Sequence, residues 1–115
     1  MAGTIKTSNG DEYELKRAVV TASSANATAI VNAVAAKRIV VVGLLYTANA
    51  AVNVKWQSAS TDLTGLDYMV QGSRTLLPPN PDGWFETAVN EALNIHLSGA
   101  VAVGGFINYY EKLPY

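Results

Sequence analysis

The chain has 115 residues, half of them hydrophobic, and no cysteine, so it can bury a core without disulfide bonds. Its formal net charge is −1 and its lysines and arginines are scattered, which argues against nucleic-acid binding, because that function needs a basic stripe. The longest apolar run, residues 39–46, is too short to cross a bilayer, and the polar start of the sequence leads us to expect no secretory signal there. We therefore expect a soluble protein with no membrane partner.

Residues 1–12 are small and polar, and we expect them to form an extended, flexible arm. A single domain is predicted to follow at residues 13–115. Its first strand is expected at residues 13–22, where apolar and polar side chains alternate weakly. Residues 27–34 are compatible with a helix, because they are rich in alanine, or with a strand, because they contain several β-branched side chains. Of the two, we predict the strand.

Residues 39–46 are apolar at both odd and even positions, which predicts a central strand with both faces buried. One face would meet a second sheet, and the other a partner or another layer. Val52, Val54 and Trp56 then alternate with polar residues, so this segment is predicted to be a half-buried strand with Trp56 in the core.

The middle of the chain, residues 58–83, is rich in turn signals and ends in a rigid, proline-rich segment. Residues 84–89 are expected to return to a sheet. Two alternating runs, residues 93–97 and 101–109, flank Ser98-Gly99 and predict a β-hairpin. Glycines 104 and 105 lie inside a strand pattern, where glycine marks a bulge or a close backbone approach.

These elements amount to about eight short strands with turns every eight to twelve residues. This spacing is typical of an all-β protein, and we predict an antiparallel β-sandwich.

Side chains that could perform chemistry do not converge in the sequence pattern. The only histidine, His96, lies on the polar side of its predicted strand. Asp62 and Asp67 lie in turn-rich sequence, and Glu86 and Glu91 flank a bend. We therefore predict no catalytic residue, no metal site, no cofactor and no enzymatic activity. The weaker alternative is an enzyme that uses Asp62, Asp67 or His96.

Aromatic residues near the C-terminal third form the candidate interaction surface. Trp84 and Phe85 are adjacent, so in a strand they face opposite sides and one of them lies away from the core. Aromatic side chains are enriched in protein–protein interfaces. The candidate interface residues are Trp84, Phe85, Tyr109 and Tyr110. A glycan-stacking platform is the alternative use of these rings.

Four segments of the chain carry a resemblance to a known group of proteins: residues 37–45, 51–65, 83–97 and 101–109. Their series of strands and turns resembles small virion structural proteins of tailed bacteriophages, with capsid decoration (cement) proteins as the nearest kind. The similarity covers residues 27–110. It implies a jelly-roll-like β-sandwich that assembles as a homotrimer on the major capsid protein and stabilises the outside of the phage head.

The same resemblance implies that the protein is soluble in the host cytoplasm before assembly and part of the virion afterwards. It also leaves an alternative, in which the chain is a tail- or fibre-associated module that binds host-surface glycans.

Overall fold

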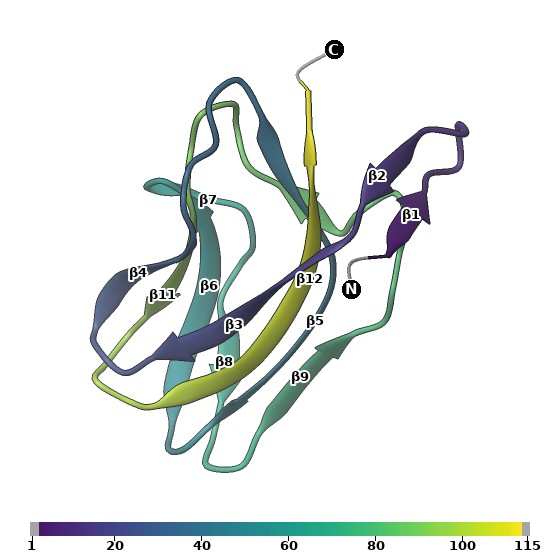
Figure 1. Cartoon of the computed structure of the whole chain (residues 1–115). Helices are drawn as coiled ribbons and strands as arrows, with labels where there is room; N and C mark the ends of the chain where they lie inside the picture. The colour runs from purple at the N-terminus through teal and green to yellow at the C-terminus, as the bar shows by residue number, and fades with distance from the viewer. Residues whose placement is uncertain (1–2, 114–115) are drawn as a thin grey trace.

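Every regular element of residues 3–113, the part of the chain described by this computed structural model, is a β-strand. Ten of the strands form two antiparallel five-stranded sheets that pack against each other (Figure 1). The predicted all-β antiparallel sandwich is therefore confirmed, whereas its jelly-roll path stays a prediction. The strands outnumber the predicted eight because short pairs also form in the expected N-terminal arm and in the turn-rich residues 58–83.

The first sheet is built around β5, the longest strand. β5 pairs with β12 on one side and with β9 and β10 on the other, and β12 in turn pairs with β3. The strands of this sheet are β3 (Lys16–Ala22), β5 (Arg38–Ala48), β9 (Arg74–Leu77), β10 (Phe85–Glu86) and β12 (Val103–Lys112).

The second sheet is centred on β6 and β11. The predicted strand at residues 27–34 is confirmed as β4, which pairs with β11 at the edge of this sheet. The strands are β4 (Asn26–Val31), β6 (Val52–Ser58), β7 (Thr61–Asp62), β8 (Asp67–Met69) and β11 (Leu93–Leu97).

The main core lies between the two sheets. β11 contributes Leu93, Ile95 and Leu97, each with no exposed surface, and β6 contributes Trp56, which is 2% exposed. The core position predicted for Trp56 is thus confirmed. Burial of such alternating apolar side chains from both sheets provides most of the free energy that stabilises a sandwich.

β5 is buried on both faces, as predicted. Val41 faces the main core, while Val40 and Val42 belong to a second, smaller cluster with Tyr110. A bulge near Val42 shifts the register, because Asn108 pairs with Gly43 but the next residue of β12 pairs with Val41. The chain's own N-terminal segment covers this second face at Val40 and Val42.

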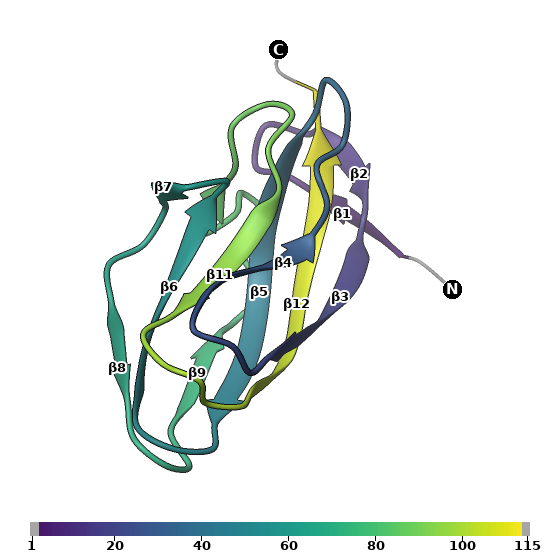
Figure 2. The ribbon, with the colours of Figure 1, turned by 90° about the vertical axis from the view of Figure 1, so that its left-hand side faces the viewer.

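That N-terminal segment corrects the expectation of an extended arm. Strands β1 (Thr4–Lys6) and β2 (Glu12–Glu14) pair as a hairpin, and Gly10 closes its turn with a φ of 93°. Tyr13 stacks on Tyr110 with ring centroids 4.4 Å apart. The hairpin lies on the side of the first sheet away from the second sheet (Figure 2). The segment folds back because its apolar side chains, Ile5 and Tyr13, pack against the sheet. Residues 1–2 lie outside the described range.

The predicted hairpin between residues 93–97 and 101–109 is wrong. β11 pairs with β4 and β6, whereas β12 pairs with β3 and β5, so the chain crosses from one sheet to the other between them. Period-2 alternation shows which side of a strand is buried, but it does not show which strand lies beside it. Both runs bury their apolar sides in the same core, from opposite sheets.

The close backbone approach predicted for the glycine pair is confirmed at Gly105. A Cβ atom on this residue would lie 1.9 Å from the carbonyl oxygen of Leu45, on the neighbouring strand β5. At Gly104 the nearest atom to such a Cβ would be the Val20 carbonyl oxygen, at 3.8 Å. Of these two glycines, Gly105 is therefore the one that the packing of the sheet requires.

Candidate protein-interaction site

Asp67, one of the carboxylates weighed as catalytic, has a structural role. Its Oδ2 accepts a hydrogen bond from the Tyr46 hydroxyl at 2.7 Å and another from the Thr75 hydroxyl. These bonds connect β8 of the second sheet to β5 and β9 of the first. Burial, followed by the hydrogen bond to Asp67, raises the pKa of Tyr46 well above its usual range. The group therefore holds the two sheets together at one edge.

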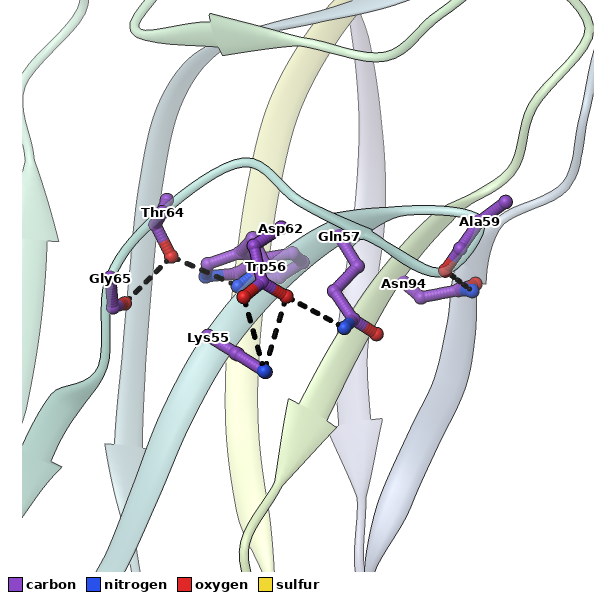
Figure 3. Close-up of polar contacts among 8 residues, drawn as sticks. All are labelled: Lys55, Trp56, Gln57, Ala59, Asp62, Thr64, Gly65 and Asn94. Atoms are coloured by element: carbon purple, nitrogen blue, oxygen red, sulfur yellow. Dashed lines mark hydrogen bonds and ion pairs between the residues drawn. The ribbon is translucent and has the colours of Figure 1, made fainter.

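Asp62 also belongs to a local polar network (Figure 3). Its Oδ1 accepts a hydrogen bond from Gln57 Nε2 at 2.8 Å and lies 3.1 Å from Lys55 Nζ. The hydrogen bond from Gln57, with a further contribution from Lys55, lowers the pKa of Asp62. Asn94 Nδ2 donates to the Ala59 carbonyl oxygen at 2.9 Å. These contacts fasten the loop after β6 onto the outer face of the second sheet.

The other titratable candidates are dispersed. Glu86 pairs with Lys112 at 3.2 Å, and Glu91 accepts a hydrogen bond from the Ser58 hydroxyl. His96 lies on β11, opposite Lys55 of β6, with its side chain on the polar face as predicted. Within residues 3–113, no three acidic or histidine side chains gather closely enough to hold a metal ion. That the protein is not an enzyme stays a prediction.

Trp84 and Phe85 face opposite sides, as predicted. Trp84 is 42% exposed, and its indole Nε1 donates a hydrogen bond to the Pro78 carbonyl oxygen at 2.8 Å. Phe85 is half-buried and packs against Trp56, with ring centroids 6.2 Å apart. Of this pair, Trp84 is the side chain with a substantial surface available to a partner.

Tyr110 lies inside the chain's own packing, which corrects its assignment as an interface residue, whereas an interface role for Tyr109 stays a prediction. Tyr110 is 2% exposed beneath Tyr13, and Tyr109 is half-buried against the main core. The sequence reasoning missed this because consecutive residues of β12 face opposite sides, and here both sides are covered. Burial raises the pKa of Tyr110 above its ordinary value.

The structure reveals a surface that the sequence reasoning missed. Four apolar side chains align across four neighbouring strands on the outer face of the first sheet. Val19 on β3 pairs with Phe106 on β12, which pairs with Leu45 on β5, which in turn pairs with Leu76 on β9. Val19 is 68% exposed and Leu76 is 63% exposed, while the two central side chains are half-buried. We call these four residues the apolar row.

The apolar row shares its sheet face with the cluster of Val40, Val42 and Tyr110. The N-terminal hairpin covers that cluster, and the row lies on the part of the face that the hairpin does not cover. A sequence signal for the row existed in β5 and β12, where both parities carry large apolar side chains. This pattern indicated that the outer face of the sheet packs against another segment, but it did not indicate how much of the face that segment covers.

A second exposed apolar set flanks β8 at the edge of the second sheet. Leu66 is 45% exposed, Tyr68 75% and Val70 65%, and alternation along the strand places them on the outward side. They form a stripe along one short strand. The apolar row, in contrast, spans four paired strands and is backed by the centre of a sheet.

Comparison of the chain with protein-family models, with curated protein sequences and with solved structures found no match. Nor does the part of the chain between residues 3 and 113 include a helix with the length and apolar character of a membrane span.

Proposed function

We propose that this chain is a non-enzymatic structural subunit that binds another protein through the apolar row. The observation that carries this proposal is the alignment of four apolar side chains across β3, β12, β5 and β9, with the two outer ones more than half exposed. Contiguous apolar surface of this kind on a folded domain marks an interaction site. A paired sheet is a rigid support, so docking on it requires little ordering of the backbone.

The resemblance to tailed-phage virion proteins supplies the setting for this contact. The proposed role is that of a capsid decoration subunit, which assembles as a trimer on the major capsid protein and stabilises the outside of the head. The sandwich supports this role as a rigid unit that joins its neighbours through side-chain contacts. Many modest contacts, repeated by the symmetry of a shell, would together resist rupture of the particle.

The test is cryo-electron microscopy of phage particles assembled with this protein. We expect ordered density for the sandwich at repeated positions on the head, with the apolar row in contact with a neighbouring subunit. Leu76→Ser should lower the occupancy of these positions, while the matched change Val70→Ser on β8's flank should leave it unchanged. The proposal would be overturned by particles that carry the protein at no ordered position.

A second candidate function is recognition of a host-surface glycan, and Tyr68 favours it. This ring is 75% exposed and lies opposite Asn53 on β6, beside the polar outer face of the second sheet. Aromatic rings next to amide side chains can stack on and hydrogen-bond to sugars. Titration with host polysaccharide would test the idea. Binding that disappears in Tyr68→Ala would support it, and absence of binding by the folded protein would remove it.

A further inference from the structure

We infer that the partner of the apolar row is a protein segment in which apolar side chains are flanked by carboxylates. This inference rests on the proposed function, because it takes the row to be a protein contact, and it names the chemistry of the partner. The observations behind it are two arginines beside the row and a hollow at one end of it, in whose lining Arg74 is the one charged residue.

Arg17 and Arg74 lie at opposite edges of the row. Arg17 is two residues before Val19 on β3, and its guanidinium carbon lies 5.0 Å from the centre of the Phe106 ring. Arg74 is two residues before Leu76 on β9, at the other edge. Because side chains alternate along a strand, both arginines share the outer face with the row.

Both arginines are exposed, and among the described residues neither has a carboxylate within ion-pair distance. Among residues 3–113, the ion pairs join lysines to carboxylates, and neither Arg17 nor Arg74 takes part in one or donates a side-chain hydrogen bond. Arg38, in comparison, donates to the Thr87 carbonyl oxygen. A guanidinium offers a planar set of donors that matches a carboxylate. Two guanidinium groups on this face are therefore available to bind carboxylates of a partner.

The positions next to the row on its own four strands carry no carboxylate. The outward residues next to it on the same strands are neutral apart from the two arginines: Thr21, Gly43, Thr47, Gly104 and Asn108. Two copies of the chain docked face to face would bring four guanidinium groups and no acid into one interface, which is unfavourable. Charge complementarity therefore favours a partner that supplies the carboxylates.

A hollow of about 650 Å³ extends the row at the Arg74 end. Its walls include Thr21 and Thr47, which neighbour the row, together with Asn49 and Gln71. Arg74 is the only charged residue among those that line it. Alanines, glycines, a valine and a serine complete the lining, so the guanidinium, with the hydroxyl and amide groups beside it, supplies the donors that can bind a carboxylate. The hollow thus has room for an acidic end of the segment that lies on the row.

The experiment uses the whole protein and two short peptides with the same apolar centre, flanked by glutamates in one and by lysines in the other. Binding is followed by NMR through the backbone amide shifts. We expect the glutamate peptide to shift amides of β3, β5, β9 and β12, and to bind about tenfold more tightly than the lysine peptide, a difference that higher salt reduces. The double variant Arg17→Gln/Arg74→Gln should abolish this preference.

A matched control removes two charges elsewhere, in Lys6→Gln/Lys37→Gln, and should keep the preference. Equal binding of both peptides, or shifts outside the four strands, would overturn the inference. So would light scattering showing that Val19→Ser/Leu76→Ser converts an oligomer into a monomer, because a second copy would then occupy the row.

The two proposals fail separately. If the glutamate peptide binds the row but phage particles carry no ordered copy, the virion role falls and the partner chemistry stands. If particles carry the protein and its occupancy is unchanged in Arg17→Gln/Arg74→Gln, the virion role stands and the partner chemistry falls.

Discussion

The outer face of the first sheet has two halves that differ in what covers them. β5 and β12 contribute to both halves, and each half carries large apolar side chains. In the covered half, Val40, Val42 and Tyr110 are at most 2% exposed beneath the N-terminal hairpin. In the uncovered half, the apolar row remains open to solvent. The same alternation of residues thus gives a buried cluster or an exposed surface, depending on which part of the face residues 3–15 cover.

The cover itself depends on the half that it protects. β1 and β2 form a separate two-stranded sheet, and such a hairpin is only marginally stable in isolation. Its apolar residues Ile5, Tyr13 and Leu15 pack against the covered half, so hairpin and sheet stabilise each other. The uncovered half gains no such stabilisation within the chain, and its side chains are therefore free to stabilise a complex.

The two halves should differ most in how the free energy of unfolding changes when one side chain of each is truncated to alanine. Tyr110→Ala removes a buried ring from the covered half and should lower the free energy of unfolding by about 3–5 kcal/mol. Leu76→Ala in the uncovered half should change it by less than about 0.5 kcal/mol. Urea denaturation followed by tryptophan fluorescence measures both. Tyr110→Phe, which keeps the ring, is the control, and equal losses in both halves would contradict the comparison.

The two adjacent glycines of β12 should differ in how much stability is lost when each is replaced by alanine. Gly105→Ala would place a methyl group against the β5 backbone and should lower the free energy of unfolding by about 3 kcal/mol. Gly104→Ala adds its methyl group on the uncovered half, where there is space, and should change the free energy by less than about 1 kcal/mol. Thermal unfolding of the pair tests this. Similar melting temperatures would show that the strand contact at Gly105 can relax.

Weakening the contact between the N-terminal hairpin and the covered half should expose the covered half to solvent, as the uncovered half already is. Tyr13→Ala removes the ring that stacks on Tyr110 and should cost about 2 kcal/mol of stability. Amides of the hairpin should then exchange faster, and a dye that binds apolar surface should bind more strongly. Val19→Ala, on the uncovered half, serves as the control and should change neither readout. An unchanged exchange rate in Tyr13→Ala would mean that the hairpin does not depend on this stacking.

The pH dependence of stability should show a smaller effect of the burial of Tyr110 beneath the hairpin. Burial raises the folded-state pKa of Tyr110 above the value of about 10 expected in the unfolded chain. Its contribution to stability is therefore complete below about pH 10 and is lost as the pH rises through the folded-state pKa. Denaturation between pH 8 and 11 should show a smaller decline in Tyr110→Phe than in the original protein. Tyr46→Phe tests the same effect inside the main core, and an identical decline in all three proteins would contradict the assignment.

The sequence carried enough information for the class of fold and for the burial of individual strands. The period-2 pattern of residues 52–57 placed Trp56 in the core, and the apolar run at 39–46 indicated a strand buried on both faces. It also separated Trp84 from Phe85, because neighbours in a strand point to opposite sides. All of these are local consequences of strand geometry, which a single segment determines without knowledge of its neighbours.

Strand pairing and the extent of cover were decided only in the tertiary structure. Residues 93–97 and 101–109 looked like partners, yet they lie in opposite sheets, and Tyr110 was expected at an interface but lies beneath the N-terminal hairpin. The apolar row forms because four strands from distant parts of the chain pair in a register that places their apolar side chains next to one another. Alternation fixes which face of a strand is apolar, while the neighbours across that face are chosen by the packing of the whole chain.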